Sequence, residues 1–335
     1  MVLIVEKINS RFVEATKSKQ STGLSVCLEM IKKLDQKIVL LKKFTAEEVY
    51  LAIKAHKPKA VIFEAMSFSY LTLIETKRMF PDVDIFVHMH SKFPFLGQEH
   101  SPVYFVEQCV ENGIGVIFNH RDMLNTLPLP GCIYLPNVYS PVYSPDNSIK
   151  LSHGNNNLHV GCHGSLRHMK NHIVQAAAAC RYAKRIGKQL YFHVNTTRND
   201  GELAAIQSNL TRVLKLNGGN IVHTPWLDHN KFLEYIAKLD IGMQVSLCET
   251  FNLVAADYVH AGIPIVVSPE IEWASDQSKF YGTDVSEIVS GMHLAMMRKD
   301  LIQANKNCLV EHNTKAVYDW KVFLSKYIEG VSSGF

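Results

Sequence analysis

The stretch MQVSLCETFNLVAADYVHAGIPIVV, residues 243–267, decides the fold class of this chain. It predicts an apolar strand, a short acidic loop, a helix, a Gly-Ile-Pro turn and a second apolar strand. Apolar residues recur at helical spacing over Phe251–Ala261, and Gly262 and Pro264 end that helix, because glycine accepts the left-handed conformation and proline cannot continue the helix. A strand–helix–strand unit is typical of a parallel α/β sheet.

Two carboxylates mark this stretch. Glu249 follows the first strand, where α/β folds place ligand groups, and Asp257 lies within the expected helix. Their spacing is just over two helical turns, so we expect both side chains on roughly the same side. Taken alone, such a pair is more often one acid at a helix start and one solvated acid.

The rest of the chain alternates between strands and helices in the same way. At 335 residues the chain is longer than a single hydrophobic core usually supports, so two domains are expected. The segment Tyr139–Asn157 is rich in Pro, Ser, Asn and Gly and predicts a linker. The expected domains are residues 1–145 and 146–315, each a Rossmann-like α/β domain, with a cleft between their strand ends.

The first domain is expected to contain six strands, four helices and a polar loop. The strands are Val2–Ile8, Ile38–Leu41, Ala60–Glu64, Ile85–His90, Gly115–Asn119 and Cys132–Leu135; the helices are Gly23–Leu34, Thr45–Ala55, Tyr70–Phe80 and Val103–Asn112; the loop is Asn9–Thr22.

The composition narrows the class of protein. An apolar fraction of 47% and a charged fraction of 20% are ordinary for a soluble globular enzyme, and a net charge of +4 is too weak alone to imply nucleic acid. The seven cysteines form no CxxC pair, which favours reduced thiols in a cytoplasmic protein. The N-terminus does not resemble a signal peptide, and no segment is long and apolar enough to span a membrane. The sequence does not indicate an oligomeric state.

Several segments together resemble the large retaining glycosyltransferase family with the GT-B fold, the glycogen synthase and mannosyltransferase-like group. ETFNLVAADYVHAGIPIVVS, from Glu249, resembles its E-x-F-G-x-x-x-x-E-A-x-A-x-G-x-P-V-V signature. Leu135–Val138 resembles its I-P-N-G-V turn, and Gly164–Asn171 resembles its G-x-L-x-x-x-K-N loop. Trp320 resembles the aromatic of C-terminal helices that cross back to the first domain, here at about residues 316–335.

The resemblance assigns roles within the second domain. It implies that Glu249 binds the hydroxyls of the transferred sugar, that Asp257 binds the ribose of the nucleotide, and that Lys170 binds the diphosphate. The family's arginine close to the preceding strand is replaced here by Ser165 or Cys162, so Arg167 would supply the second cation from a shifted position. Asp257 is one methylene shorter than the usual Glu, and Asn252 replaces the usual Gly, which leaves the loop backbone less free. The implied donor-binding residues are Gly164, Ser165, Thr250, Phe251, Asn252, Leu253 and Asp257, with Gly23 and Asn137 from the first domain.

His88 and His90 end the fourth strand of the first domain. Alternate residues of a strand share a face, so both imidazoles are expected to point the same way. The resemblance implies that they act in catalysis, with His90 the first choice for contacting the donor sugar. A metal pair is the alternative, but no third ligand of suitable spacing follows, and no metal is expected. The alternative without a functional role is that one histidine lies in the core and the other on the surface.

The resemblance therefore implies a retaining, metal-independent glycosyltransferase that moves a sugar from a UDP- or GDP-linked donor to a hydroxyl of a glycan or small molecule. One alternative is transfer to hydroxymethylated pyrimidines in DNA, because His88-Met89-His90-Ser91 resembles a His-Asp-His-Ser stretch of phage enzymes. A sugar-nucleotide epimerase and a non-catalytic sugar-nucleotide binding protein are further alternatives. The donor base, the sugar and the acceptor remain open.

Overall fold

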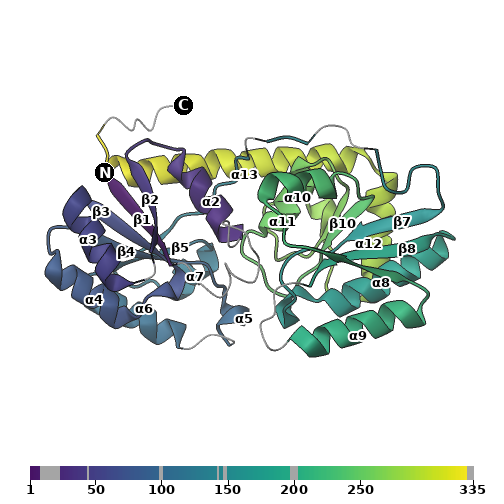
Figure 1. Ribbon diagram of the computed structural model, residues 1–335, viewed down its shortest axis with the longest axis horizontal. Helices are drawn as coiled ribbons and strands as arrows, with labels where there is room; N and C mark the ends of the chain where they lie inside the picture. The colour runs from purple at the N-terminus through teal and green to yellow at the C-terminus, as the bar shows by residue number, and fades with distance from the viewer. Residues whose placement is uncertain are drawn as a thin grey trace. The chain divides into compact units, whose positions relative to one another are not determined.

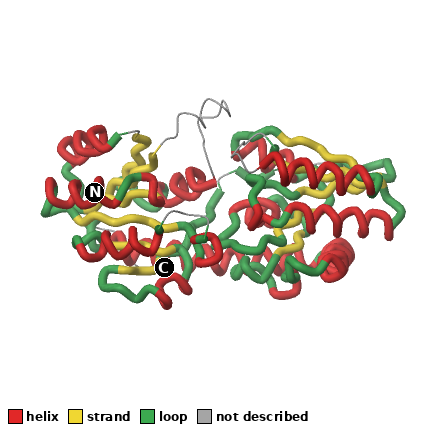
Figure 2. Tube along the Cα trace, turned by 90° about the horizontal axis from the view of Figure 1, so that it is seen from below, coloured by secondary structure: helices red, strands yellow, loops and turns green. Residues whose placement is uncertain are grey.

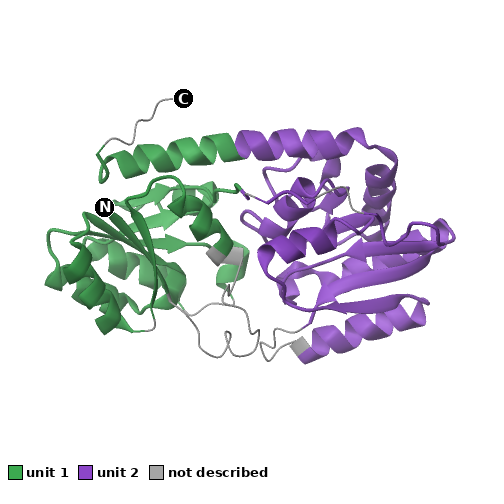
Figure 3. Ribbon diagram, turned by 45° about the horizontal axis from the view of Figure 1, so that its top comes forward, with its two compact units in different colours: residues 1–13, 21–140, 313–335 green, residues 14–20, 141–312 purple. Residues whose placement is uncertain are grey.

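A computed structural model of the protein describes residues 1–7, 23–43, 45–97, 101–141, 143–145, 149–196 and 203–329. The predicted polar loop Asn9–Thr22 lies outside these residues. The described chain divides into two compact units (Figure 3). Unit 1 contains the described residues of 1–140 and 313–329, and unit 2 contains those of 141–312.

Unit 1 is built on a six-stranded parallel sheet in the order β2-β1-β3-β4-β5-β6. These strands are apolar runs bounded by turns, and the central ones are buried on both faces, as expected for a parallel sheet. Their bounds are β1 Val2–Lys7, β2 Ile38–Lys43, β3 Ala60–Glu64, β4 Asp84–Met89, β5 Gly115–Phe118 and β6 Cys132–Tyr134.

Unit 2 is built on a five-stranded parallel sheet in the order β11-β10-β7-β8-β9. Read from the other edge, the sequence order is third, second, first, fourth, fifth, which is the Rossmann arrangement. The strand order therefore reverses between β7 and β10, which pair directly. The bounds are β7 Asn157–Gly161, β8 Gln189–Asn195, β9 Asn220–Thr224, β10 Ile241–Gln244 and β11 Ile265–Val267.

Helices flank both sheets (Figures 1 and 2). In unit 1 they are α2 Gly23–Lys32, α3 Ala46–His56, α4 Tyr70–Met79, α5 Phe93–Leu96, α6 Pro102–Glu111 and α7 Arg121–Thr126. In unit 2 they are α8 His172–Arg185, α9 Leu203–Leu216, α10 His229–Ile236, α11 Leu253–His260 and α12 Val285–Met297, and α13 Asp300–Ser325 continues into unit 1. In the described part of the chain, no helix is long and apolar enough to cross a membrane.

Local sequence explains where these helices begin. Thr45 accepts a hydrogen bond from the Glu48 N–H, and Glu48 reaches back to the Thr45 N–H, which completes a capping box at α3. The predicted C-terminal helix begins at Asp300 rather than near residue 316, and it ends at Ser325. Its second half belongs to unit 1, where the buried Trp320 indole donates to the Pro136 carbonyl at 2.8 Å.

Two glycines let a tyrosine of α11 pack directly onto the sheet of unit 2. A Cβ atom at Gly161 of β7 would lie 2.2 Å from the Tyr258 hydroxyl, and one at Gly242 of β10 would lie 2.6 Å from its ring. The Tyr258 ring is completely buried, and its hydroxyl lies 2.5 Å from His163 Nδ1. Tyr258 therefore fixes α11 against the two strands at which the sheet order reverses.

Candidate functional site

The loops after β7 and β10 form the candidate site of unit 2. Parallel α/β sheets bind ligands outside the carboxyl ends of their strands, at the point where the strand order reverses. In this sheet that point lies between β7 and β10. The loop after β7 contains Gly164, Arg167 and Lys170, and the loop after β10 contains Glu249, so most of the predicted ligand groups follow these two strands.

Lys170 and Glu249 form an ion pair within unit 2. Lys170 belongs to the 3-10 helix η2, His168–Lys170, and Glu249 lies in the loop before α11. Their side chains are 21% and 9% exposed. The structure thus brings together the two residues predicted for phosphate and sugar binding, and both can be reached from solvent.

Hydrogen bonds hold the two loops to each other. The Leu247 N–H donates to the Met169 carbonyl at 2.7 Å, and Asn171 Nδ2 donates to the Val245 carbonyl at 3.1 Å. Gln175 of α8 accepts from the Val245 N–H at 2.9 Å and donates to the Lys170 carbonyl at 2.7 Å. Because several bonds fix both loops, the protein itself holds the Lys170–Glu249 pair in place.

The start of α8 adds hydrogen-bond donors beside Lys170. Asn171 precedes this helix in the left-handed conformation, with φ 57°, and makes no side-chain capping bond. A helix N-terminus with uncapped N–H groups favours an anion. Gly164 also has a positive φ, 110°, and its N–H donates to Asn195 Oδ1 at 3.0 Å. Arg167 stands in extended conformation immediately before η2.

Asn252 preserves the backbone that a glycine would provide. It adopts the left-handed conformation, with φ 57°, which Asn tolerates better than most residues. Its side chain accepts from the Ala255 N–H at 2.9 Å and donates to Gln244 at 2.9 Å, so it caps α11. Asn252 therefore takes a backbone conformation that the usual glycine would also reach, and its side chain fixes the turn and starts the helix.

The two carboxylates of the opening stretch have separate partners. The helix begins only at Leu253, so Glu249 lies outside it, and the premise of helical spacing between Glu249 and Asp257 is wrong. The Asp257 side chain is 3% exposed, and its Oδ1 lies 2.7 Å from His229 Nε2. His229 begins α10 and was missed by sequence reasoning, since nothing in its local pattern marks it.

The remaining predicted donor-binding residues are spread over both units. Phe251 is buried, its carbonyl accepts from the Trp273 indole at 2.5 Å, and its ring lies against His312. Ser165 is buried in the loop after β7, while Thr250 and Leu253 are partly exposed. In unit 1, Gly23 begins α2 and Asn137 is buried after β6.

A second cluster lies at the carboxyl ends of β3 and β4 in unit 1. Glu64 is the register partner of His88, and both histidines contact its carboxylate. His88 Nδ1 lies 3.3 Å from Glu64 Oε1, and His90 Nε2 lies 2.7 Å from Glu64 Oε2. Asn119, after β5, places Nδ2 at 3.2 Å from His90 Nδ1. We call Glu64, His88, His90 and Asn119 the histidine cluster.

Burial and charge determine the protonation states in this cluster. Burial raises the pKa of the Glu64 carboxyl, but His88 and His90 lower it by more, to about 2. Burial and the neighbouring His88 lower the pKa of His90, against the opposing effect of Glu64. Near pH 7 the cluster therefore contains an ionised carboxylate beside a neutral His90.

The histidine cluster corrects one step of the sequence reasoning. A third group does stand beside His88 and His90, but it precedes them in the chain and comes from the neighbouring strand. Glu64 ends an apolar strand run, and that polar ending was the available signal. His88 is fully buried, whereas the His90 side chain is 20% exposed, so of the two predicted histidines only His90 is reached by solvent.

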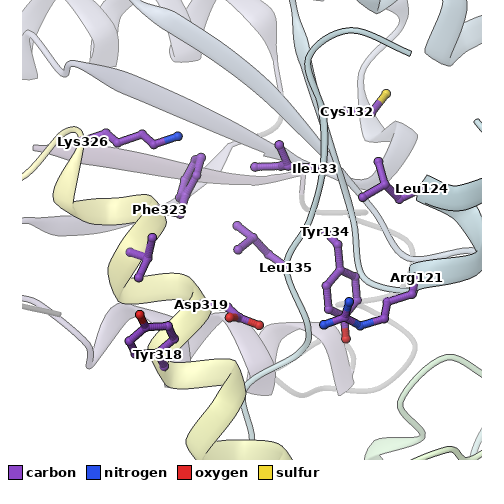
Figure 4. A pocket seen from close by; sticks show the side chains of 11 residues that line it. Arg121, Leu124, Cys132, Ile133, Tyr134, Leu135, Tyr318, Asp319, Phe323 and Lys326 are labelled. Atoms are coloured by element: carbon purple, nitrogen blue, oxygen red, sulfur yellow. The ribbon is translucent and has the colours of Figure 1, made fainter. Parts of the chain in front are cut away.

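Unit 1 also contains a cavity of about 480 Å³ beside the edge strand β6 (Figure 4). Its walls come from α7, the β6 segment and the end of α13. The Arg121 guanidinium lies 4.6 Å from the centre of the Tyr134 ring, and Asp319 and Lys326 add further charges. Among the described residues, its lining is distinct from the histidine cluster.

Similarity to known proteins is found at the level of structure. No protein-family model and no curated protein sequence matches the chain. The trehalose-6-phosphate synthase OtsA has a TM-score of 0.71 and 13% identity, over 97% of this chain and 98% of that chain. The fold is GT-B.

Two further solved structures are similar to the chain over nearly its whole length. An E. coli trehalose-6-phosphate protein bound with UDP-2-fluoro glucose has a TM-score of 0.70 and 12% identity, over 97% of this chain and 98% of that chain. A UDP-forming α,α-trehalose-phosphate synthase from Burkholderia vietnamiensis has a TM-score of 0.69 and 10% identity, over 100% of this chain and 98% of that chain. The predicted fold class, two tandem Rossmann-like domains of the GT-B type, is confirmed.

Proposed function

We propose that this protein is a retaining glycosyltransferase that binds a nucleotide-linked sugar in unit 2. The single observation that carries the proposal is the Lys170–Glu249 ion pair, which lies in the loops after β7 and β10, where the strand order reverses. The fold is shared with trehalose-phosphate synthases, and one similar structure is bound with UDP-2-fluoro glucose. We also propose kinship to the family with the Glu-x7-Glu signature, with Asp257 in the second position.

Each group at this site has a chemical task. The Lys170 ammonium and the uncapped N–H groups of α8 would bind the diphosphate and stabilise the charge that grows on it during departure. Glu249 would accept hydrogen bonds from sugar hydroxyls, because a carboxylate can accept from two vicinal donors. Arg167 would supply a second cation. Asp257 would bind the ribose, together with His229, which already contacts it.

The reaction would replace one bond to the anomeric carbon by another on the same face of the sugar. The bond to the β-phosphate oxygen breaks, the acceptor oxygen bonds to the same carbon, and the acceptor proton passes to the departing phosphate oxygen. Lys170 and α8 would favour this step by stabilising the leaving group, without a requirement for a metal ion. Unit 1 would bind the acceptor, a small carbohydrate that offers a hydroxyl, and the partly exposed His90 would contact the bound substrate.

The donor can be identified by thermal stability. A ligand at a hundred times its dissociation constant stabilises a protein by about 2.7 kcal/mol. In a panel of UDP- and GDP-linked sugars, the correct donor should therefore raise the melting temperature more than the others. That sugar should then be transferred to a carbohydrate acceptor with retained anomeric configuration, as measured by NMR.

A lysine variant outside the proposed site provides the control. Lys170→Met should reduce the stabilisation by donor to about half or less and lower transfer roughly 10²–10³-fold. Lys184→Met, an exposed lysine on α8, should leave both unchanged. Normal transfer by the Lys170 variant, or no stabilisation by any donor, would show that the proposed function is wrong.

A further inference from the structure

The histidine cluster has the geometry of a cation site. Glu64 and His88 are register partners on adjacent parallel strands, so their side chains leave the same face of the sheet. His90 follows two residues later, on the same face as His88. Each of the three residues offers one ligand atom, and these atoms all lie within 4.8 Å of one another.

We propose that Glu64, His88 and His90 bind a divalent transition-metal ion, zinc or iron(II). Two imidazole nitrogens and one carboxylate oxygen are the ligand set of open zinc sites and of non-haem iron sites. Magnesium and calcium prefer oxygen ligands throughout and do not match this set. Nothing in the proposed glycosyltransferase function requires this metal site.

The arrangement of the ligand atoms supports this assignment. Glu64 Oε2 lies 3.3 Å from His88 Nδ1 and 2.7 Å from His90 Nε2, so all three groups already converge. Metal bonds of roughly 2.0–2.2 Å place neighbouring ligand atoms about 3 Å apart, and small side-chain rotations reach that spacing. The two strands, rather than flexible loops, hold Glu64 and His88 in place.

Burial leaves one side of the site open. The side chains of Glu64 and His88 are 1% and 0% exposed, and the side chain of His90 is 20% exposed. The protein would therefore enclose the ion on the inner side. A coordination position on the His90 side would remain for water or for an oxygen atom of a substrate.

Asn119 provides the support that a metal-binding histidine needs. A histidine that binds metal through Nε2 carries its proton on Nδ1 and donates it to a neighbouring acceptor. The Asn119 side-chain amide lies 3.2 Å from His90 Nδ1, and rotation of this amide by half a turn presents its oxygen there. Asn119 is then a positioning residue for His90.

The test is direct metal binding by the full-length protein after treatment with a chelator. Isothermal titration calorimetry with zinc chloride should give one site per chain, and cobalt(II) should give visible absorption bands of a site with nitrogen and oxygen ligands. Asn119→Ala should weaken zinc binding roughly 10-fold or more. Glu64→Gln and His90→Ala should weaken it further, and His90→Asp, which keeps a ligand, should retain more of it.

His56→Ala is the matched control, since His56 is an exposed histidine of the same unit. If Glu64→Gln does not fold, His90→Ala decides, because His90 is partly exposed. Equal zinc affinity in the wild type and in His90→Ala would overturn the proposal and leave the cluster as a hydrogen-bonded set. Donor binding to unit 2 should be unchanged in Asn119→Ala, so failure of the metal site and failure of the proposed function are distinguishable.

Discussion

Replacing Glu249 by glutamine should tighten the binding of a nucleoside diphosphate while lowering sugar transfer. Glu249 forms an ion pair with the Lys170 ammonium, which is the group proposed to bind the diphosphate. Glutamine keeps the shape of the side chain and removes its charge. Lys170 is then free for the phosphate oxygens, and the repulsion between carboxylate and phosphate is lost.

The size of the effect follows from charge and exposure. The charges that matter are the Glu249 carboxylate and a phosphate bound to Lys170. Two unit charges roughly 5 Å apart interact by about 3 kcal/mol at an effective dielectric constant of 20. Lys170 is 21% exposed, so solvent screens part of this energy, and about 1 kcal/mol remains as the expected gain. That energy corresponds to about fivefold tighter binding. Lys170→Met should act in the opposite direction, with roughly 10–100-fold weaker binding from the loss of a charged hydrogen bond.

The assay is isothermal titration calorimetry with UDP, GDP and other nucleoside diphosphates, at low and high salt. Lys184→Met serves as the charge-matched control for Lys170→Met. The gain in Glu249→Gln should shrink at high salt, because screening weakens the interaction. Weaker diphosphate binding by Glu249→Gln than by the wild type would refute the division of roles between the two side chains.

Three further predictions test the structure around the site. Burial lowers the pKa of His172 to about 3, so the unfolded chain takes up a proton that the folded chain does not, and stability falls as the pH drops below about 6.5; between pH 7 and 5.5, His172→Leu should lose about 1 kcal/mol less unfolding free energy than the wild type, and parallel urea-denaturation curves would contradict this. Asn252→Ala should destabilise by about 2 kcal/mol from the lost cap and the left-handed backbone, and Asn252→Gly by less; equal losses in chemical denaturation would argue against the backbone contribution. Gly242→Ala should destabilise by about 1–3 kcal/mol through its clash with the Tyr258 ring, with partial recovery in a Tyr258→Leu background measured by the same denaturation.

The alternation of strands and helices was predictable because each strand is a short apolar run that ends at a turn. Ala60–Glu64 was predicted with its observed bounds, and the Thr45 cap marked the start of α3. The start of α13 was not predictable in the same way. Its first half bonds to unit 2, where Asn305 accepts from the Ser275 N–H, and its second half bonds to unit 1 through Trp320. In its first half the buried positions Leu301, Asn305 and Leu309 include a polar residue and stand among polar neighbours, so the apolar pattern before residue 316 is weak.

The candidate site of unit 2 was largely predictable because its groups follow individual strands within short loops. Lys170 and Glu249 could be found one loop at a time, and only their contact required the structure. The contacts of Asp257 with His229 and of Glu64 with His90 could not be found in this way. Both join residues from separate elements, and strand register or helix packing brings them together.

The two clusters differ in the charge that they offer to a ligand. In unit 2 the Glu249 carboxylate is neutralised by Lys170. The long, partly exposed side chain of Lys170 can turn toward another anion while its backbone stays in place. In unit 1 the Glu64 carboxylate is buried between the imidazoles of His88 and His90, which β4 and the residue after it hold in place. An anion therefore competes with Glu249 for Lys170, whereas a cation joins the Glu64 carboxylate without displacing a lysine or an arginine. The same position at the strand ends thus suits a diphosphate in unit 2 and a metal ion in unit 1.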